Sequence, residues 1–145
     1  MQSLLISACL LGIPCRYNGK ALEKDALIPD WLKEKYHLIP FCPEIYGGLP
    51  TPRDPGERVG NRVLSIRGID LSKQYMCGAT AALRLAQQFD CKLALLKDKS
   101  PSCGVNQIYD GTFSGCIKQG MGVTAELLQK NGISVYSDTK IELLF

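Results

Sequence analysis

The segment that decides the fold of this chain is residues 93–104, LALLKDKSPSCG. Its first four residues, 93–96, form a short apolar run of the kind that becomes a buried strand. The run leads directly into a loop in which Cys103 lies between Pro101 and Gly104. Two lysines and two serines surround this position, and a restrained, electropositive loop favours the thiolate, which attacks electrophiles or binds metal. Packing alone does not account for such a loop.

Two other apolar runs end in a cysteine in the same way. Residues 4–8 lead into Cys9, and residues 37–41 lead into Cys42. The helical pattern between these runs favours a parallel, right-handed crossover, and open parallel sheets bind ligands at the carboxyl edge. The chain is therefore predicted to be an α/β domain with a mainly parallel sheet, in which Cys9, Cys42 and Cys103 converge at one edge.

Length and composition limit the classes of function. The 145 residues suffice for one domain, expected to span 1–145, and are too few for two. An apolar content of 46% and a charged content of 21% are typical of a globular protein and argue against disorder and membrane insertion. The net charge of +3 gives little support to RNA binding through bulk charge. The seven cysteines lack the dense, evenly paired framework of a small secreted domain, so a cytoplasmic protein is expected.

The remaining segments alternate between helical and strand patterns. Residues 21–35 read as mostly helical with an interruption at Pro29, whereas residues 43–60 hold too many prolines and glycines for any regular element. Residues 109–115 are rich in turn formers. The other predicted elements are an edge strand at 63–66, a helix from Asp70 or Ser72 to about Phe89, a helix reaching Lys130 and a strand near 133–136.

Cysteines at three equivalent strand ends favour ligation of an iron-sulfur cluster, because such clusters are held mainly by thiolates. The alternative is that they are small apolar side chains buried at strand ends. Cys15 is the only other cysteine in a suitable place for a fourth ligand. Without Cys15 one iron keeps an open position, which by analogy with zinc marks a catalytic site. Cys77 and Cys91 are expected to lie outside the site.

Charged residues near the cysteines are further candidates. Glu44 follows Cys42 by two residues, so it either reaches a ligand on the open iron or is a solvated loop glutamate. Arg53, Lys97 and Lys99 suit one anionic group, such as a phosphate, better than a polynucleotide.

A glycine pattern late in the chain is a weaker signal. Residues 120–125 match the dinucleotide fingerprint only in part, since no strand directly precedes them. The start of the following helix, at Gly122, could still hold a phosphate or a carbonyl oxygen.

Six motifs taken in order resemble the thiouracil desulfidase family over nearly the whole chain. They are SACLLG at 7–12, CRY at 15–17, CPE at 42–44, GGLPTPR at 47–53, SPSCG at 100–104 and YDGTF at 109–113. The resemblance implies a Rossmann-like three-layer domain and a 4Fe-4S cluster held by Cys9, Cys42 and Cys103. It also implies that Glu44 and Ser100 are the acid-base and positioning groups.

The resemblance implies a reaction as well. The expected substrates are 2-thiouracil, 4-thiouracil or 4-thiouridine 5'-monophosphate, which water converts to the uracil compound and hydrosulfide without net redox change. The expected substrate-binding residues are Arg53, Lys97, Lys99, Ser102 and Gly122. Two alternatives remain open: an iron-sulfur or thiol redox sensor without turnover, and a nucleotide-binding module with incidental cysteines. The sequence also leaves open whether base, nucleotide or RNA is preferred and whether the domain forms a homodimer.

Overall fold

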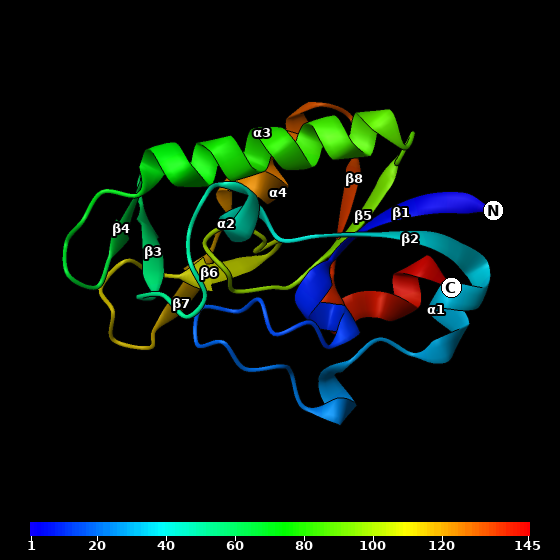
Figure 1. Ribbon diagram of the computed structural model, residues 1–145, viewed down its shortest axis with the longest axis horizontal. Helices are drawn as coiled ribbons and strands as arrows, with labels where there is room; N and C mark the ends of the chain where they lie inside the picture. The colour runs from blue at the N-terminus through cyan, green and yellow to red at the C-terminus, as the bar shows by residue number, and fades with distance from the viewer.

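A sheet of four parallel strands forms the centre of the computed structural model, which describes residues 1–145 (Figure 1). The strand order is β2-β1-β5-β8, with β1 at Gln2–Ser7, β2 at Tyr36–Phe41, β5 at Leu93–Leu96 and β8 at Ser134–Ser137. The chain runs from β1 out to β2 and then crosses to β5 on the other side of β1. The order therefore reverses beside β1, and ligands bind outside the carboxyl ends of strands at such a switch point.

Alternation along the strands gives the sheet two apolar faces. Leu5 and Ala94 belong to one core cluster, whereas Leu4, Ile6 and Leu95 belong to the other. The first face is covered by α3 (Ser72–Gln88) and α4 (Val123–Lys130), and the second by α1 (Asp30–Lys35) and the C-terminal 3-10 helix η3 (Asp138–Leu144) (Figure 1). The prediction of a three-layer α/β domain with a parallel sheet is confirmed.

Helix α3 is the longest helix, at 17 residues, and it carries alanines and a glycine on its inner face. A Cβ atom on Gly78 would lie 1.8 Å from the carbonyl oxygen of Pro43, so only glycine fits there. This close approach seats the one-turn helix α2 (Pro43–Tyr46), which carries Glu44, against α3. No helix of the structure combines the length and the apolar character needed to cross a bilayer.

Two antiparallel hairpins stand beyond the strand ends, separate from the main sheet (Figure 1). One pairs β3 (Gly56–Val59) with β4 (Arg62–Ser65). The other pairs β6 (Gln107–Tyr109) with β7 (Ile117–Gln119). They form walls beside the carboxyl edge of the sheet.

Three predictions of local structure are wrong. Residues 43–60 contain α2 and β3, because a proline fits the first turn of a helix and the hairpin supplies β3 with a partner. The strand at 63–66 pairs with β3 instead of the edge of the main sheet. Residues 21–29 hold only the 3-10 turn η2 (Lys24–Ala26), since the backbone is extended at Leu27 and at Pro29. The helices α3 and α4 and the strand β8 confirm the remaining predictions.

Candidate active site

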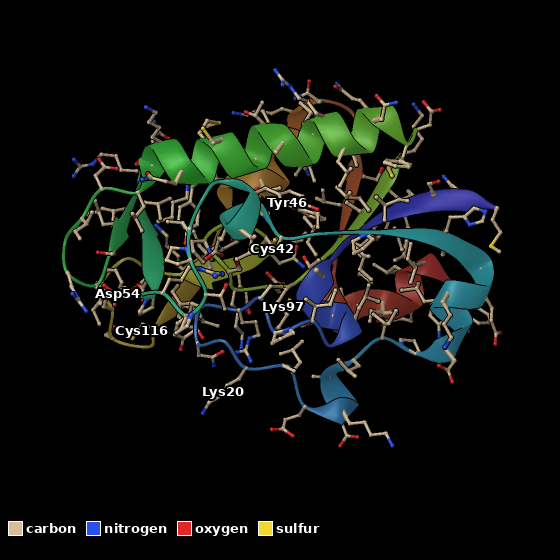
Figure 2. All side chains as sticks on the ribbon, in the orientation of Figure 1. Lys20, Cys42, Tyr46, Asp54, Lys97 and Cys116 are labelled. Carbon is tan, nitrogen blue, oxygen red and sulfur yellow. The ribbon has the colours of Figure 1, made fainter.

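A cavity of about 430 Å³ opens at the carboxyl ends of β1, β2 and β5. Cys9 follows β1, Cys42 (labelled in Figure 2) lies between β2 and α2, and Cys103 lies in the loop after β5. All three line the cavity. Cys9 and Cys103 are buried and Cys42 is half-buried. The predicted convergence of these cysteines is confirmed. Cys77, exposed on α3, and Cys91, buried in the core, lie outside the cavity as expected.

The cavity cysteines differ in acidity. Burial raises the pKa of Cys9 to about 11 and moves the pKa of Cys103 well above its usual range. A hydrogen bond from the Cys15 thiol to the ionised sulfur lowers the pKa of Cys42 to about 7. A negative charge on Cys42 in turn raises the pKa of both Cys9 and Cys103. Three thiolates in this cavity therefore need a positive partner, which a bound metal centre provides.

The three cysteines reach the cavity from three separate strand ends. No three cysteine, histidine or acidic side chains are arranged to bind one metal ion together. In a 4Fe-4S cluster each cysteine binds a different iron, so the sulfurs must surround a common space without meeting at one point. Sulfurs that line one cavity from three separate strand ends meet this requirement.

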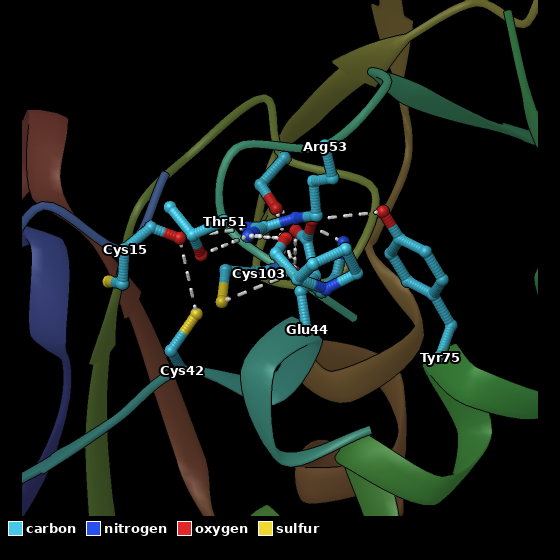
Figure 3. A network of polar contacts seen from close by, with 10 residues as sticks. Cys15, Cys42, Glu44, Thr51, Arg53, Tyr75 and Cys103 are labelled. Atoms are coloured by element: carbon cyan, nitrogen blue, oxygen red, sulfur yellow. Dashed lines mark hydrogen bonds and ion pairs between the residues drawn. The ribbon is translucent and has the colours of Figure 1, made fainter. Parts of the chain in front are cut away.

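Glu44 is the centre of a hydrogen-bond network beside the cysteines (Figure 3). Its Oε1 accepts hydrogen bonds from Arg53 Nε at 2.9 Å and from the Tyr75 hydroxyl at 3.0 Å. Its Oε2 accepts a hydrogen bond of 2.9 Å from Ser102 Oγ. The side chains of Glu44 and Arg53 are only 12% and 6% exposed, so water screens this ion pair little. One carboxylate oxygen is thus held by the ion pair and the other is directed at the Cys103 loop.

Arg53 forms hydrogen bonds with several segments around the cavity. Its Nη1 donates to the Pro50 carbonyl at 3.2 Å and to Thr51 Oγ1 at 3.0 Å. Its Nη2 donates to the Cys15 carbonyl at 2.9 Å, an oxygen that also lies 3.7 Å from the Cys42 sulfur (Figure 3). The guanidinium predicted to bind substrate is therefore engaged by partners within the protein.

Two serines connect Glu44 to the Cys103 loop. Ser100 Oγ lies 2.8 Å from Ser102 Oγ and accepts hydrogen bonds of 3.1 Å from the backbone N–H groups of Ser102 and Cys103. Since the hydroxyl hydrogen of Ser102 is donated to Glu44, Ser100 is the donor in the serine pair. The hydrogen bonds therefore run in one direction, from Ser100 through Ser102 to Glu44.

The Cys103 loop rests on the N-terminus of α4. The N–H of Thr124 donates to the Ser102 carbonyl at 2.9 Å, and the N–H of Gly122 donates to the Gly104 carbonyl at 2.8 Å. A Cβ on Gly122 would lie 2.4 Å from the Ser102 carbonyl oxygen. Gly122 is not among the residues that line the cavity, and its contact with substrate stays a prediction. The helix start holds a carbonyl of the protein itself.

Asp98 organises the beginning of the same loop, and it was missed by sequence reasoning. Asp98 is 5% exposed, and its Oδ2 accepts a hydrogen bond of 2.8 Å from the Ser137 hydroxyl. Its Oδ1 accepts from the backbone N–H groups of Lys99, Val105, Asn106 and Gln107. Burial alone would raise the pKa of Asp98, but these hydrogen bonds outweigh it, and the pKa lies below its usual value. An aspartate two residues after a strand is a signal for such a turn.

Cationic side chains lie around the cavity. Lys97 (labelled in Figure 2) and Lys99 line it, and Lys97 Nζ lies 3.3 Å from Asp138 Oδ2. Their contact with substrate stays a prediction. Arg16 also lines the cavity. Its place directly after Cys15 was the signal that would have found it.

Comparison with known proteins agrees with this geometry. A family model described as 2-thiouracil desulfurase matches residues 4–140. The chain belongs to the 2-thiouracil desulfurase family. Protein YbbK of Bacillus subtilis (strain 168) is 39% identical over 150 residues, which cover 95% of this chain and 97% of YbbK. The structure of the 4Fe-4S-dependent thiouracil desulfidase TudS matches with a TM-score of 0.93 and 40% identity, over 99% of this chain and 95% of that one.

Membership of the 2-thiouracil desulfurase family confirms the resemblance drawn from the motifs. All six motifs contribute residues to the cavity lining, although they are spread from residue 7 to residue 113. The six motifs that carry the family resemblance in the sequence thus contribute residues to the lining of one cavity in the fold.

Proposed function

We propose that this chain is a 4Fe-4S-dependent enzyme that replaces the sulfur of a thiolated pyrimidine with oxygen. Its family and its similarity to the 4Fe-4S-dependent thiouracil desulfidase TudS support this proposal. The observation that carries it is the convergence of Cys9, Cys42 and Cys103 on one cavity that Glu44 also lines. A buried carboxylate beside three thiols is suited to proton transfer at a metal-bound ligand.

Cys9, Cys42 and Cys103 would hold the cluster, and one iron would have no cysteine from this set. When bound, the cluster supplies a thiophilic Lewis acid that weakens the carbon-sulfur bond. We assign Cys15 to the scaffold, because its carbonyl accepts a hydrogen bond of 2.9 Å from Arg53 Nη2.

Water supplies the atoms that the reaction needs. Its oxygen forms a bond to the ring carbon, the carbon-sulfur bond breaks, and sulfur departs as hydrosulfide. Glu44 accepts one proton from the attacking water and returns it to the departing sulfur. The second proton of the water leaves the ring oxygen for solvent, so the products are the oxo compound, hydrosulfide and one proton. The ring carbon ends bonded to oxygen instead of sulfur, so no electron donor or acceptor is required.

The serines complete the acid-base machinery. Ser102 orients the Oε2 atom of Glu44, and Ser100 orients Ser102 through the hydrogen bond of 2.8 Å between their hydroxyls. In this scheme Ser100 positions the pyrimidine or the water. Arg53 and Tyr75 hold the other carboxylate oxygen, so the group that moves the proton has one defined orientation. A positioned acid-base group typically contributes about 10²- to 10⁴-fold to the rate.

The substrates we propose are 2-thiouracil, 4-thiouracil and 4-thiouridine 5'-monophosphate. A cavity of about 430 Å³ is in the range of sites for small molecules, which favours these compounds over RNA. Lys97 and Lys99 are the side chains placed to meet a phosphate if the substrate is a nucleotide.

An anaerobic turnover assay tests the proposal. Protein reconstituted with iron and sulfide is incubated with each of the three compounds, and released hydrosulfide is measured together with loss of the thione absorbance. An enzyme releases many equivalents of hydrosulfide per chain. A redox sensor changes its spectrum with oxidant but releases none, and a nucleotide-binding module binds the monophosphate without releasing sulfur. Absence of release from all three compounds at full iron content would reject the proposal.

A further inference from the structure

Phe113 has a backbone conformation that is rare for a bulky residue. Its φ is +55°, in the left-handed region, and only two other non-glycine residues, Asp90 and Lys99, have positive φ. An aromatic side chain is disfavoured there by about 1–2 kcal/mol, whereas glycine adopts this region freely. The neighbouring positions Gly111 and Gly115 are glycines with positive φ. Residue 113 therefore has a large side chain at a position where the backbone conformation favours glycine.

A buried carboxylate holds Phe113 in this conformation. Glu57, on β3, is 8% exposed, and its Oε1 accepts hydrogen bonds from the backbone N–H of Gly111 at 2.9 Å and of Phe113 at 3.1 Å. These contacts join segments 54 and 56 positions apart in the chain. The hydrogen bonds to a charged acceptor offset the strain, as is common for strained residues at ligand-binding sites.

Phe113 is also the aromatic ring best placed to contact a ligand. The aromatic residues that line the cavity are Tyr17, Phe41, Tyr75, Tyr109 and Phe113. Phe41 and Tyr75 are 1% exposed, so almost none of either side chain is accessible. Tyr17 and Tyr109 are 43% and 37% exposed and belong to the outer surface. Phe113 is half-buried, so it combines an accessible ring with a fixed backbone.

We infer that Phe113 forms one wall of the pyrimidine site and stacks on the flat heteroaromatic ring of the substrate, with Glu57 as the residue that positions it. The inference rests on the proposed function and adds the group that recognises the ring. Stacking between a base and an aromatic side chain is sequence-tolerant and strong, because each partner offers a flat π-face. Phe113 therefore favours ligands that have an aromatic ring. The thiocarbonyl of the same ligand reacts at the end of the cavity that the three cysteines line.

Substitution of the ring tests this assignment. Phe113→Leu keeps an apolar side chain but removes the ring, so KM for 2-thiouracil is expected to rise at least about fivefold with kcat little changed. Phe113→Tyr keeps the ring and is expected to restore KM. Phe89→Leu, an exposed phenylalanine at the end of α3, is the matched control and leaves both constants unchanged. KM at the wild-type value in Phe113→Leu, at equal iron content, would overturn the inference.

A binding measurement separates this inference from the proposed function. The Kd for the product uracil, measured by anaerobic calorimetry, is expected to rise by the same factor in Phe113→Leu as KM does. Glu57→Ala releases the loop and weakens uracil binding as well, and Glu57→Gln restores binding because its amide oxygen still accepts the two N–H groups. If wild-type protein releases no hydrosulfide, the proposed function fails, and uracil binding still decides the role of Phe113. Equal uracil affinity in wild type and Phe113→Leu would show that the ring makes no contact.

Discussion

Arg53 Nε lies 2.9 Å from Glu44 Oε1, in an ion pair that is almost completely withdrawn from solvent. The Tyr75 hydroxyl donates to the same oxygen, which leaves Oε2 as the oxygen that meets Ser102. Because these partners come from a loop, from α3 and from the Cys103 loop, the orientation of one carboxylate depends on three separate parts of the fold.

Glu44→Gln is expected to lower the turnover number by about 10²-fold or more while the bound iron is retained. The glutamine side chain still accepts the hydrogen bond from Ser102, but it cannot take up a proton. Arg53 then lacks its buried counter-ion, so the free energy of unfolding is expected to fall by on the order of 3 kcal/mol. Hydrosulfide release, iron content and urea unfolding measure these effects. Glu34→Gln, exposed on α1, is the control, and near-normal turnover of Glu44→Gln at full iron content would move the acid-base role elsewhere.

Tyr75→Phe tests whether Tyr75 acts through Glu44. Tyr36 is the matched control, because it is also buried and its hydroxyl donates 2.8 Å to the Leu144 carbonyl on the far side of the sheet. Both Tyr75→Phe and Tyr36→Phe are expected to lose about 1 kcal/mol of stability. Only Tyr75→Phe is expected to lower kcat, by roughly fivefold for 1 kcal/mol of lost positioning, with KM unchanged. Equal kcat values in the two variants would make Tyr75 purely structural.

Each of Cys9→Ala, Cys42→Ala and Cys103→Ala is expected to lose bound iron and the brown colour of the reconstituted protein. Cys77→Ala and Cys91→Ala are expected to keep both, since Cys77 is exposed and Cys91 lies in the core outside the cavity. Cys15→Ala tests whether Cys15 has a structural role or is a ligand of the cluster. The substitution keeps the backbone carbonyl that Arg53 binds, so we expect iron to be retained. Loss of iron in Cys15→Ala would indicate a cluster with four protein ligands.

Asp98→Asn is expected to lower the free energy of unfolding at neutral pH by about 1–3 kcal/mol, because the amide cannot satisfy all the donors that the carboxylate accepts. The pKa of Asp98 is lowered in the folded protein. Its contribution to stability is therefore fully present above the unfolded value of about 3.9 and is lost as pH falls through the folded pKa. The difference in urea stability between wild type and Asp98→Asn should begin to shrink below about pH 4 and disappear once the pH lies below the folded pKa. A gap between them that stays constant with pH would exclude an ionised Asp98 as the cause.

Local patterns were enough to predict where the strands end. The apolar runs at 4–8, 37–41 and 93–96 each stop at a loop that carries a cysteine, and all three lie in the parallel sheet. Parallel strands share one carboxyl edge, so the order of residues alone brought Cys9, Cys42 and Cys103 together. The breaker-rich segment 43–60 was harder to predict, because α2 and β3 exist through contacts with α3 and β4.

The sequence by itself therefore determined the parallel sheet, the carboxyl edge at which the site lies and the three cysteines that meet there. It could do so because the length and direction of each strand follow from short-range patterns of apolar residues. Only the tertiary structure decided what each charged or polar group does. Arg53 pairs with Glu44, Gly122 supports a loop, and Glu57 holds the backbone of Phe113. These pairings join residues 9, 18 and 56 positions apart, and no local pattern specifies which of several buried donors and acceptors will meet. That choice belongs to the packed fold, where each buried polar group must find its partner.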